Sequence, residues 1–201
     1  LYIVCKRKDC ARINAEYINS QGGESITMRA IHHHATQKNY KPYIEPKEGA
    51  VATTSFINEL QLKIGAKVML IHNVDTTDSL TNGQLGVLIA AIKTKKEEID
   101  KILVKLNVKS AGKQNRNKHP ALASRYPDCV IIERMSNQYT LRKKSGDVSS
   151  TATVIQFPIK LAFAITSHKI QGQTIPWPIK VVLDIDSVFE DAQAHVMLSR
   201  V

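Results

Sequence analysis

Two apolar runs near the ends of the chain constrain its fold more than any other feature. Residues 1–5 (LYIVC) and 179–186 (IKVVLDID) are rich in β-branched side chains, as the buried strands of parallel α/β sheets are. A pattern of helical period follows the first run over residues 10–18, with Asp9 as its expected N-cap. A strand followed by a helix begins an α/β layer, so the chain ends predict a parallel sheet with flanking helices.

The middle of the chain has a different pattern. A turn at Gly65-Ala66 precedes an apolar strand, and the tight-turn pair Asn82-Gly83 precedes another. Further short strands are expected at 102–108, 129–133, 138–141 and 153–157. Several short strands separated by turns predict a small β-barrel inserted into the α/β fold.

The charge of the chain indicates a polyanionic partner. Its 201 residues, 43% of them hydrophobic, can bury a core, and 28 Lys and Arg against 18 Asp and Glu give a net charge of +10. Between residues 109 and 144 there are nine basic residues and two acidic ones, so the predicted insertion carries much of the excess. Nucleic acid is therefore the first partner to consider. Apolar runs stay far below the length of a membrane span, and we expect no membrane partner.

Cysteine and histidine do not predict a metal site. The three cysteines contain no CxxC pair, which suits a reducing compartment, and we interpret them as small core residues. Three histidines stand together at 32–34, but alternate side chains of a strand point to opposite faces, so they cannot all reach one metal. We expect no metal bound by this chain.

A string of polar residues follows the apolar run FPIKLAFA at residues 157–164. It reads AITSHKIQGQT over 164–174, where Thr166 or Ser167 is expected to cap a short helix that Gly172 ends. Ligands gather at the carboxyl ends of parallel strands, so the string is a candidate binding site. The alternative is that these residues only cover the surface of a helix.

The last segment, VFEDAQAHVMLSR, predicts a helix. Ala194, Met197 and Leu198 have helical spacing and describe a face packed on the sheet, whereas Arg200 lies off that face. By itself Arg200 could be a surface arginine that closes the helix against its dipole.

These segments resemble a known family. FPIKLAFAITSHKIQGQT and DIDSVFEDAQAHVMLSRV resemble motifs V and VI of superfamily-one DNA helicases, most closely the petite-integration-frequency (PIF) family and the helicase segment of Helitron transposons. LQLKIGAKVMLIHN and TNGQLGVL resemble the start of the small barrel in its second RecA-like domain, and CKRKDCARIN resembles its motif IV region. The resemblance implies an α/β fold, a partial second RecA-like domain (1–58 and 158–201) interrupted by a basic β-barrel (59–157).

The resemblance also implies roles for the polar residues. On the DNA side of motif V we expect Thr166, Ser167, His168 and Lys169, whose donors suit phosphate oxygens. On the nucleotide side we expect Gln171, Gly172 and Thr174. Arg200 resembles the arginine finger of motif VI, the catalytic residue that would reach the γ-phosphate from across the cleft.

The implied function is an ATP-dependent DNA helicase that moves 5′ to 3′ on single-stranded DNA and unwinds forked DNA. The sequence contains no GxxxxGK[ST] loop and no strand-terminal Asp-Glu pair. We therefore expect it to be a piece of a longer protein, with ATP and Mg²⁺ held mainly by a preceding RecA-like domain, and to be inactive alone. The family further implies a nuclear or mitochondrial location and work in DNA repair, recombination and telomere maintenance.

Two alternatives belong to other classes of protein. One is a catalytically silent nucleic-acid-binding remnant of a transposon-derived helicase. The other is a basic β-barrel protein without motor ancestry, in which His168 and Arg200 would lie far from any common cleft.

Overall fold

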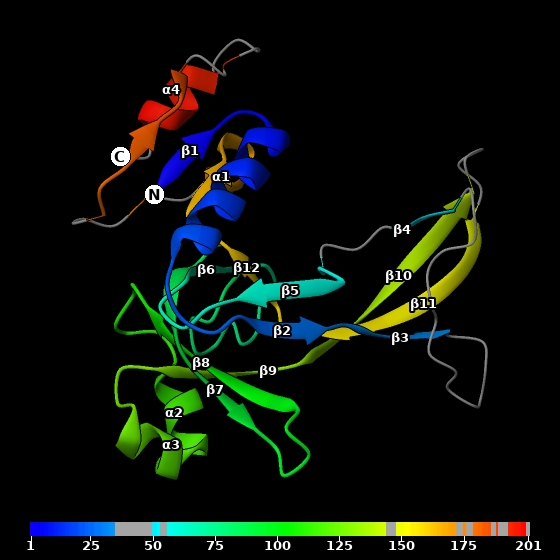
Figure 1. Ribbon diagram of the computed structural model, residues 1–201, viewed down its shortest axis with the longest axis vertical. Helices are drawn as coiled ribbons and strands as arrows, with labels where there is room; N and C mark the ends of the chain where they lie inside the picture. Colours follow the sequence, from blue (N-terminus) through cyan, green and yellow to red (C-terminus); the bar gives the residue numbers. More distant parts are fainter. Residues whose placement is uncertain are drawn as a thin grey trace.

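The computed structural model describes residues 1–34, 50–52, 56–143, 148–171, 175, 179–185, 188 and 193–199. The chain ends meet in a parallel sheet of order β13-β1-β14, in which β1 (Tyr2–Val4) pairs with β13 (Ala164–Thr166) and β14 (Val182–Leu183). Figure 1 shows the two chain ends side by side. The parallel sheet predicted from the two apolar runs is confirmed, although β14 is shorter than the run that contains it.

Helix α1 (Arg7–Ser20) covers this sheet. Its buried residue Ile13 packs with Val4 and Ala164, as the helical pattern predicts. The expected cap at Asp9 is wrong, because the helix already begins at Arg7 and Lys6 occupies the N-cap. Asp9 lies instead in the first turn, where its charge still favours the positive end of the helix dipole.

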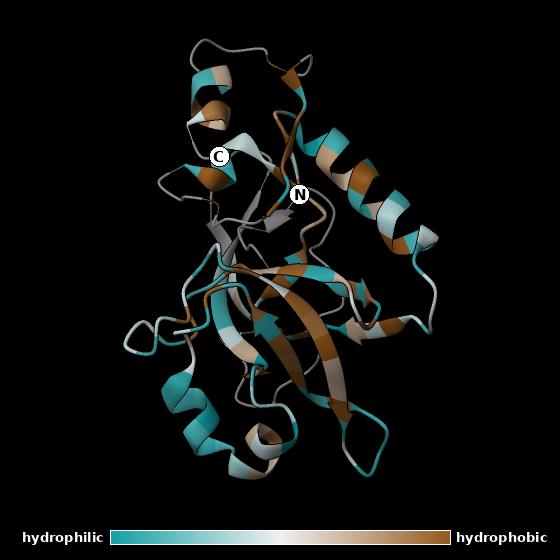
Figure 2. Cartoon of the chain, turned by 90° about the vertical axis from the view of Figure 1, so that its left-hand side faces the viewer, coloured by the Kyte–Doolittle hydropathy of each residue, from teal (hydrophilic) through white to brown (hydrophobic). Residues whose placement is uncertain are grey.

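An antiparallel sheet of order β12-β6-β7-β8-β9 forms the centre of the molecule. Its strands are β6 (Lys67–Leu70), β7 (Leu85–Lys93), β8 (Ile99–Leu106), β9 (Val130–Glu133) and β12 (Ile159–Leu161). The main core lies against it and includes the fully buried Leu88, Ile102 and Phe157. Figure 2 shows hydrophobic residues along these strands. The Asn82-Gly83 turn lies at the end of the connection from β6 to β7, and Gly83 has a φ of 94°, a value that favours glycine.

The remaining strands form two smaller sheets. Residues Ile26–Arg29 (β2) pair with Glu59–Leu62 (β5), and a four-stranded sheet of order β3-β11-β10-β4 projects from the body as an arm (Figure 1). Its strands are β3 (Ile31–His34), β4 (Ala50–Ala52), β10 (Met135–Lys143) and β11 (Val148–Gln156). Within the described ranges no strand pairing joins β9 to β12, so closure of a barrel stays a prediction, as do the domain limits.

Four short helical segments accompany the sheets. They are α2 (Lys113–Lys118), α3 (Pro120–Arg125), the 3-10 helix η1 (Ser167–Ile170) and α4 (Gln193–Leu198). Met197 of α4 is buried, and its Sδ lies 3.5 Å from the Sγ of Cys5, but Leu198 is 58% exposed, so its predicted place on the packed face is wrong. A helix of six residues presents too narrow a face to bury both neighbours. Among the described helices, none has the length and apolarity needed to cross a bilayer.

Candidate nucleic-acid groove

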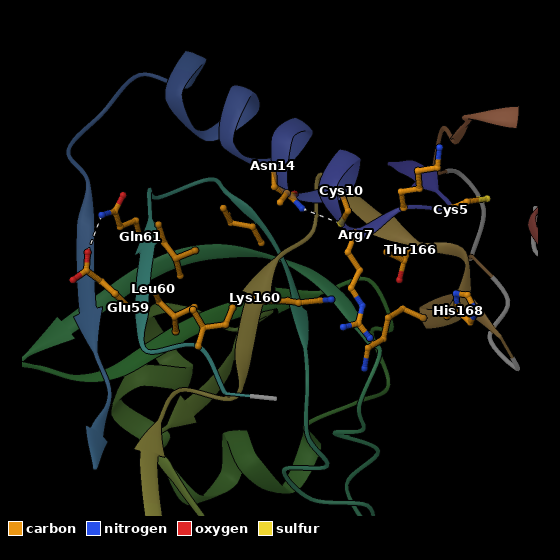
Figure 3. Close-up of a pocket in the computed structure, with 16 residues that line it drawn as sticks. Cys5, Arg7, Cys10, Asn14, Glu59, Leu60, Gln61, Lys160, Thr166 and His168 are labelled. Atoms are coloured by element: carbon orange, nitrogen blue, oxygen red, sulfur yellow. Dashed lines mark hydrogen bonds between the residues drawn. The ribbon is translucent and has the colours of Figure 1, made fainter. Parts of the chain in front are cut away.

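A groove of about 970 Å³ opens at the carboxyl ends of β1 and β13 (Figure 3). Its walls come from the start of α1, from β5 and β12, and from the end of β13 with η1. The basic residues that line it are Lys6, Arg7, Lys160, His168 and Lys169. Glu59 is the single acidic residue among the described lining residues. The groove is therefore strongly cationic.

Motif V residues reach the groove because β13 ends at Thr166 and the chain turns directly into η1. Thr166, His168 and Lys169 line the groove, and the two basic side chains are exposed. Ser167 does not line it. Its side chain is buried at 2% exposure, and in the part of the chain that the structure describes its hydroxyl has no hydrogen-bond partner. The structure thus brings three of the four expected DNA-side residues together in one groove.

Lys6 and Arg7 enter the groove from the junction of β1 and α1. Cys5 is buried at the end of β1, and α1 starts two residues later, so the two basic residues stand at the helix N-terminus. The N-cap makes no side-chain hydrogen bond. The basic cluster of CKRK was the sequence signal for these residues, but the sequence interpretation gave them no site role.

Lys160 carries a half-buried charge into the groove from β12. Burial lowers the pKa of its ammonium group, and the neighbouring cations Lys169 and Arg7 lower it further, although the Cys10 thiol acts the other way. Among the described residues no carboxylate pairs with Lys160. In Figure 3 its side chain extends toward Arg7. Unpaired cations this close together repel one another, so an anion between them would be strongly attracted.

The acidic residue of the groove is already neutralised. The Oε2 of Glu59 accepts a hydrogen bond from the Arg29 guanidinium at 3.1 Å, and its Oε1 accepts one from the Gln61 amide at 2.9 Å. The bond from Gln61 and then that from Arg29 hold the pKa of this carboxyl below its ordinary value. Glu59 therefore does not cancel the charge of the opposite wall.

Asn14 of α1 fixes the geometry of the groove. Its side-chain carbonyl accepts the backbone N–H groups of Phe163 at 2.9 Å and Ala164 at 3.0 Å, and its amide donates to the Ala164 carbonyl at 2.9 Å. Because β13 starts at Ala164, this side chain locks α1 to the strand that ends in Thr166. The start of α1, which carries Arg7, and the end of β13, which carries Thr166, are thereby held in register.

The wall formed by β5 and its neighbours is more apolar. Ile57, Leu60, Leu62 and Leu161 line it, but Leu60 and Leu62 are buried in the main core. The accessible apolar surface therefore comes from Ile57, which is 36% exposed, and from the half-buried Leu161. A groove with one cationic and one apolar wall suits a ligand that carries phosphates on one side and flat, uncharged rings on the other. Single-stranded nucleic acid has this chemistry.

Few of the predicted nucleotide-side residues can be placed. Gln171 follows η1 and is exposed, whereas Gly172, Thr174 and Arg200 lie outside the described residues. One exposed amide does not define a nucleotide site, so the roles of these four residues stay predictions. In the described ranges no three His, Cys, Asp or Glu side chains gather as metal ligands.

Comparisons with known proteins agree with the resemblance. Residues 53–90 match the family model described as DNA helicase Pif1, 2B domain. The ATP-dependent DNA helicase Pif1 of Psychrobacter sp. is 31% identical over 94% of this chain, and the PIF1 helicase of Danio rerio is 33% identical over 70% of it. The matches span 30% and 18% of those two relatives, so the chain covers a third of their length or less.

Solved structures show the same fold. The crystal structure of Pif1 helicase from Candida albicans superimposes with a TM-score of 0.65 and 26% identity, covering 99% of this chain and 42% of that one. Bacteroides Pif1 bound to ssDNA also gives a TM-score of 0.65, at 23% identity, over 100% of this chain and 38% of that one. By sequence and by fold, the chain belongs to the Pif1 helicase family.

Proposed function

We propose that this chain is the part of an ATP-dependent DNA helicase that grips single-stranded DNA in the groove between α1, β5, β12 and η1. The observation that carries the proposal is the charge of that groove: five basic side chains line it, and the one acidic side chain among its described lining residues forms an ion pair with Arg29. In support, the relatives are named ATP-dependent DNA helicases, and one structure of similar fold is described as bound to ssDNA.

The two walls would divide the strand between them. Lys6, Arg7, Lys160 and Lys169 would bind phosphate oxygens, and the Thr166 hydroxyl would donate a hydrogen bond to phosphate or sugar. Contacts to the backbone carry no sequence information, which is what a protein that moves along DNA needs. Ile57 and Leu161 would face the bases without selecting among them.

Movement would come from the way the groove is assembled. One wall belongs to the parallel sheet and α1, and the other to β5 and β12, which pair with β2 and β6. A shift between these groups of strands would change the width of the groove and hence the grip on the strand. We propose that the group of strands that includes β5 and β12 belongs to the inserted barrel, and that this barrel is closed.

The remaining parts of the motor belong to the same proposal. Gln171, Gly172, Thr174 and Arg200 would approach ATP and Mg²⁺ held mainly by a preceding RecA-like domain, with translocation 5′ to 3′ and unwinding of forked DNA. ATP bound there would supply the free energy for opening and closing the groove. Work in genome maintenance in the nucleus or mitochondrion, or in a mobile element, follows from the family resemblance alone.

Salt-dependent binding of an oligothymidine tests the groove. Lys160→Gln/Lys169→Gln removes two groove charges, and Lys95→Gln/Lys96→Gln removes two exposed charges from the β7–β8 turn as a matched control. The groove variant should lower the slope of log affinity against log salt by about 1.4, because each phosphate contact of a single strand contributes about 0.7. The control should keep the slope.

Equal slopes for the two variants would overturn the assignment of the groove. The helicase part is tested separately in a protein that also contains the proposed preceding RecA-like domain. There Arg200→Ala should abolish ATP hydrolysis and spare DNA binding. Binding of DNA without any ATP hydrolysis by the unaltered longer protein would leave the groove standing and would support the silent remnant.

A further inference from the structure

Helices α2 and α3 contribute nothing to the core. Neither helix contains a buried residue, and Figure 2 shows α2 as an almost entirely hydrophilic element. The stretch from Asn107 to Pro127 contains five basic residues and no Asp or Glu. A helical pair without core residues serves the surface, and this surface is basic.

The pair is nevertheless held firmly in place. The buried Asp78 carboxylate accepts backbone N–H groups of Gln114 at 2.9 Å and Asn115 at 2.7 Å. The Asn115 side chain accepts the N–H of Ile131 at 2.8 Å and donates to its carbonyl at 2.9 Å, as a neighbouring strand would. α2 is thus fastened to β9, and its outward charges keep a fixed position.

Much of the charge on this surface is unpaired. Lys109, Lys113 and Arg125 form no ion pair among the described residues, whereas Lys105 pairs with Asp128 at 2.9 Å. Lys105 lowers the pKa of the Asp128 carboxyl most, and Lys109 lowers it further, as does Arg116, so several cations surround one acidic group. The Nζ of Lys118 lies 3.8 Å from a carboxylate oxygen of Asp75, which is half-buried.

This basic surface is separate from the groove. Figure 1 places α2 and α3 at the end of the five-stranded sheet that is remote from α1, and they protrude from it. A protruding surface cannot enclose a single strand as the groove can. Its one Phe, Tyr or Trp side chain is Tyr126, and the Arg125 guanidinium lies over one face of that ring at 5.4 Å, so the surface offers no row of aromatic rings for stacking on bases.

We propose that α2 and α3, together with Lys105 and Lys109, form a second nucleic-acid contact, which binds the phosphate backbone of a duplex. A surface that offers charge without stacking gains most from the polyanion with the highest charge density, and duplex DNA has one charge per about 1.7 Å of axis. The exposed amides of Gln114 and Asn117 stand between the cations and add hydrogen-bond donors for phosphate. This inference rests on the proposed function, because the duplex bound here would be continuous with the single strand held in the groove.

Binding of a blunt-ended duplex tests this contact. In Lys109→Gln/Lys113→Gln the slope of log affinity against log salt should fall by about 1.8, because each phosphate contact on B-DNA contributes about 0.9. The control Lys95→Gln/Lys96→Gln should keep the duplex slope. Both variants should bind oligothymidine as the unaltered chain does, which separates this contact from the groove.

Three results would overturn the proposal. The first is an unchanged duplex slope in Lys109→Gln/Lys113→Gln, and the second is an equal fall of that slope in the control Lys95→Gln/Lys96→Gln. The third is that Lys109→Gln/Lys113→Gln loses only affinity for polyglutamate, which would assign the surface to an acidic protein. If the double variant unfolds, the duplex slope of Arg125→Gln tests the contact independently from α3. Loss of oligothymidine binding in Lys160→Gln/Lys169→Gln with the duplex slope retained would leave both proposals standing. Failure of only one set of variants shows which site is wrong.

Discussion

Replacing Asn14 by leucine should destabilise the chain far more than its half-buried position suggests. The side chain makes three hydrogen bonds of 2.9 to 3.0 Å to the backbone of Phe163 and Ala164. Leucine has the same branched shape and the same number of side-chain heavy atoms but can make none of these bonds. At about 1 kcal/mol for each net hydrogen bond, the free energy of unfolding should fall by about 3 kcal/mol.

This loss is a large share of the stability of an ordinary domain, which is about 5–15 kcal/mol. For a chain of this size it corresponds to a fall of roughly 6–12 °C in Tm. Urea unfolding followed by circular dichroism measures the change as a lower transition midpoint at an unchanged slope. Oligothymidine affinity should fall as well, because Asn14 holds the wall that carries Arg7 against the strand that carries Thr166.

Asn19→Leu is the matched control. Asn19 lies on the same helix, is exposed and makes no hydrogen bond through its side chain among the described residues, so the same substitution there should change the unfolding free energy by less than about 0.5 kcal/mol. Equal effects at the two positions would refute the reasoning, since helix propensity alone would then explain both. A loss below about 1 kcal/mol at Asn14 would show that water replaces the bonds.

Two further predictions concern charge and backbone. Lys160→Met should raise the unfolding free energy by about 0.5–1 kcal/mol at neutral pH while it weakens oligothymidine binding. Burial lowers the pKa of Lys160 in the folded chain. The free-energy cost of burying its charge is therefore full below that folded pKa and disappears as pH rises toward the unfolded pKa of about 10.4. The stability advantage of the methionine variant should shrink over the same pH window. Gly112→Ala should cost more than about 2 kcal/mol in urea unfolding, because φ is 77° and the new Cβ would lie 2.1 Å from Val130 Cγ1. Gly22→Ala, which meets no atom within 4 Å, should leave the urea midpoint nearly unchanged.

The sequence predicts elements well where local pattern and burial agree. β1, α1, β7 and β8 follow from apolar periodicity, and the Asn82-Gly83 pair marks the turn before β7. The helix α2 was missed because KQNRNK has no apolar face, and the helix depends on the carboxylate of Asp78, more than 30 residues earlier in the chain. Such a long-range cap leaves no local signal.

The residues of the groove also divide into those that local sequence predicts and those that only the fold brings together. Thr166, His168 and Lys169 were predicted because they stand together in a polar string after a strand, and because that string resembles motif V of the helicase family. Arg7 and Lys160 were missed, since only the parallel pairing of β1 with β13 and the antiparallel pairing of β12 with β6 bring residues so far apart in sequence to one place. Residues that strand pairing brings together from distant parts of the sequence cannot be found from the spacing of a motif.

The excess positive charge of this chain is not spread evenly over its surface. Some cations away from the groove and the α2–α3 surface pair with acids: Lys93 with Glu97, Lys101 with Glu133 and Arg12 with Glu16. Lys160 shows the contrast most clearly, because it is half-buried beside two other cations and no carboxylate among the described residues pairs with it.

Stability alone would not favour such an arrangement, since a half-buried charge without a partner opposes folding. An acidic residue in the groove would relieve that cost, yet the acid that does stand there, Glu59, is directed to Arg29 instead. Several cations of the two surfaces, among them Lys160, Lys109 and Lys113, thus form no ion pair with the acids that the structure describes. An external polyanion would remove the electrostatic penalty that the folded chain leaves in place, and our proposal names single-stranded DNA for the groove and duplex DNA for the α2–α3 surface.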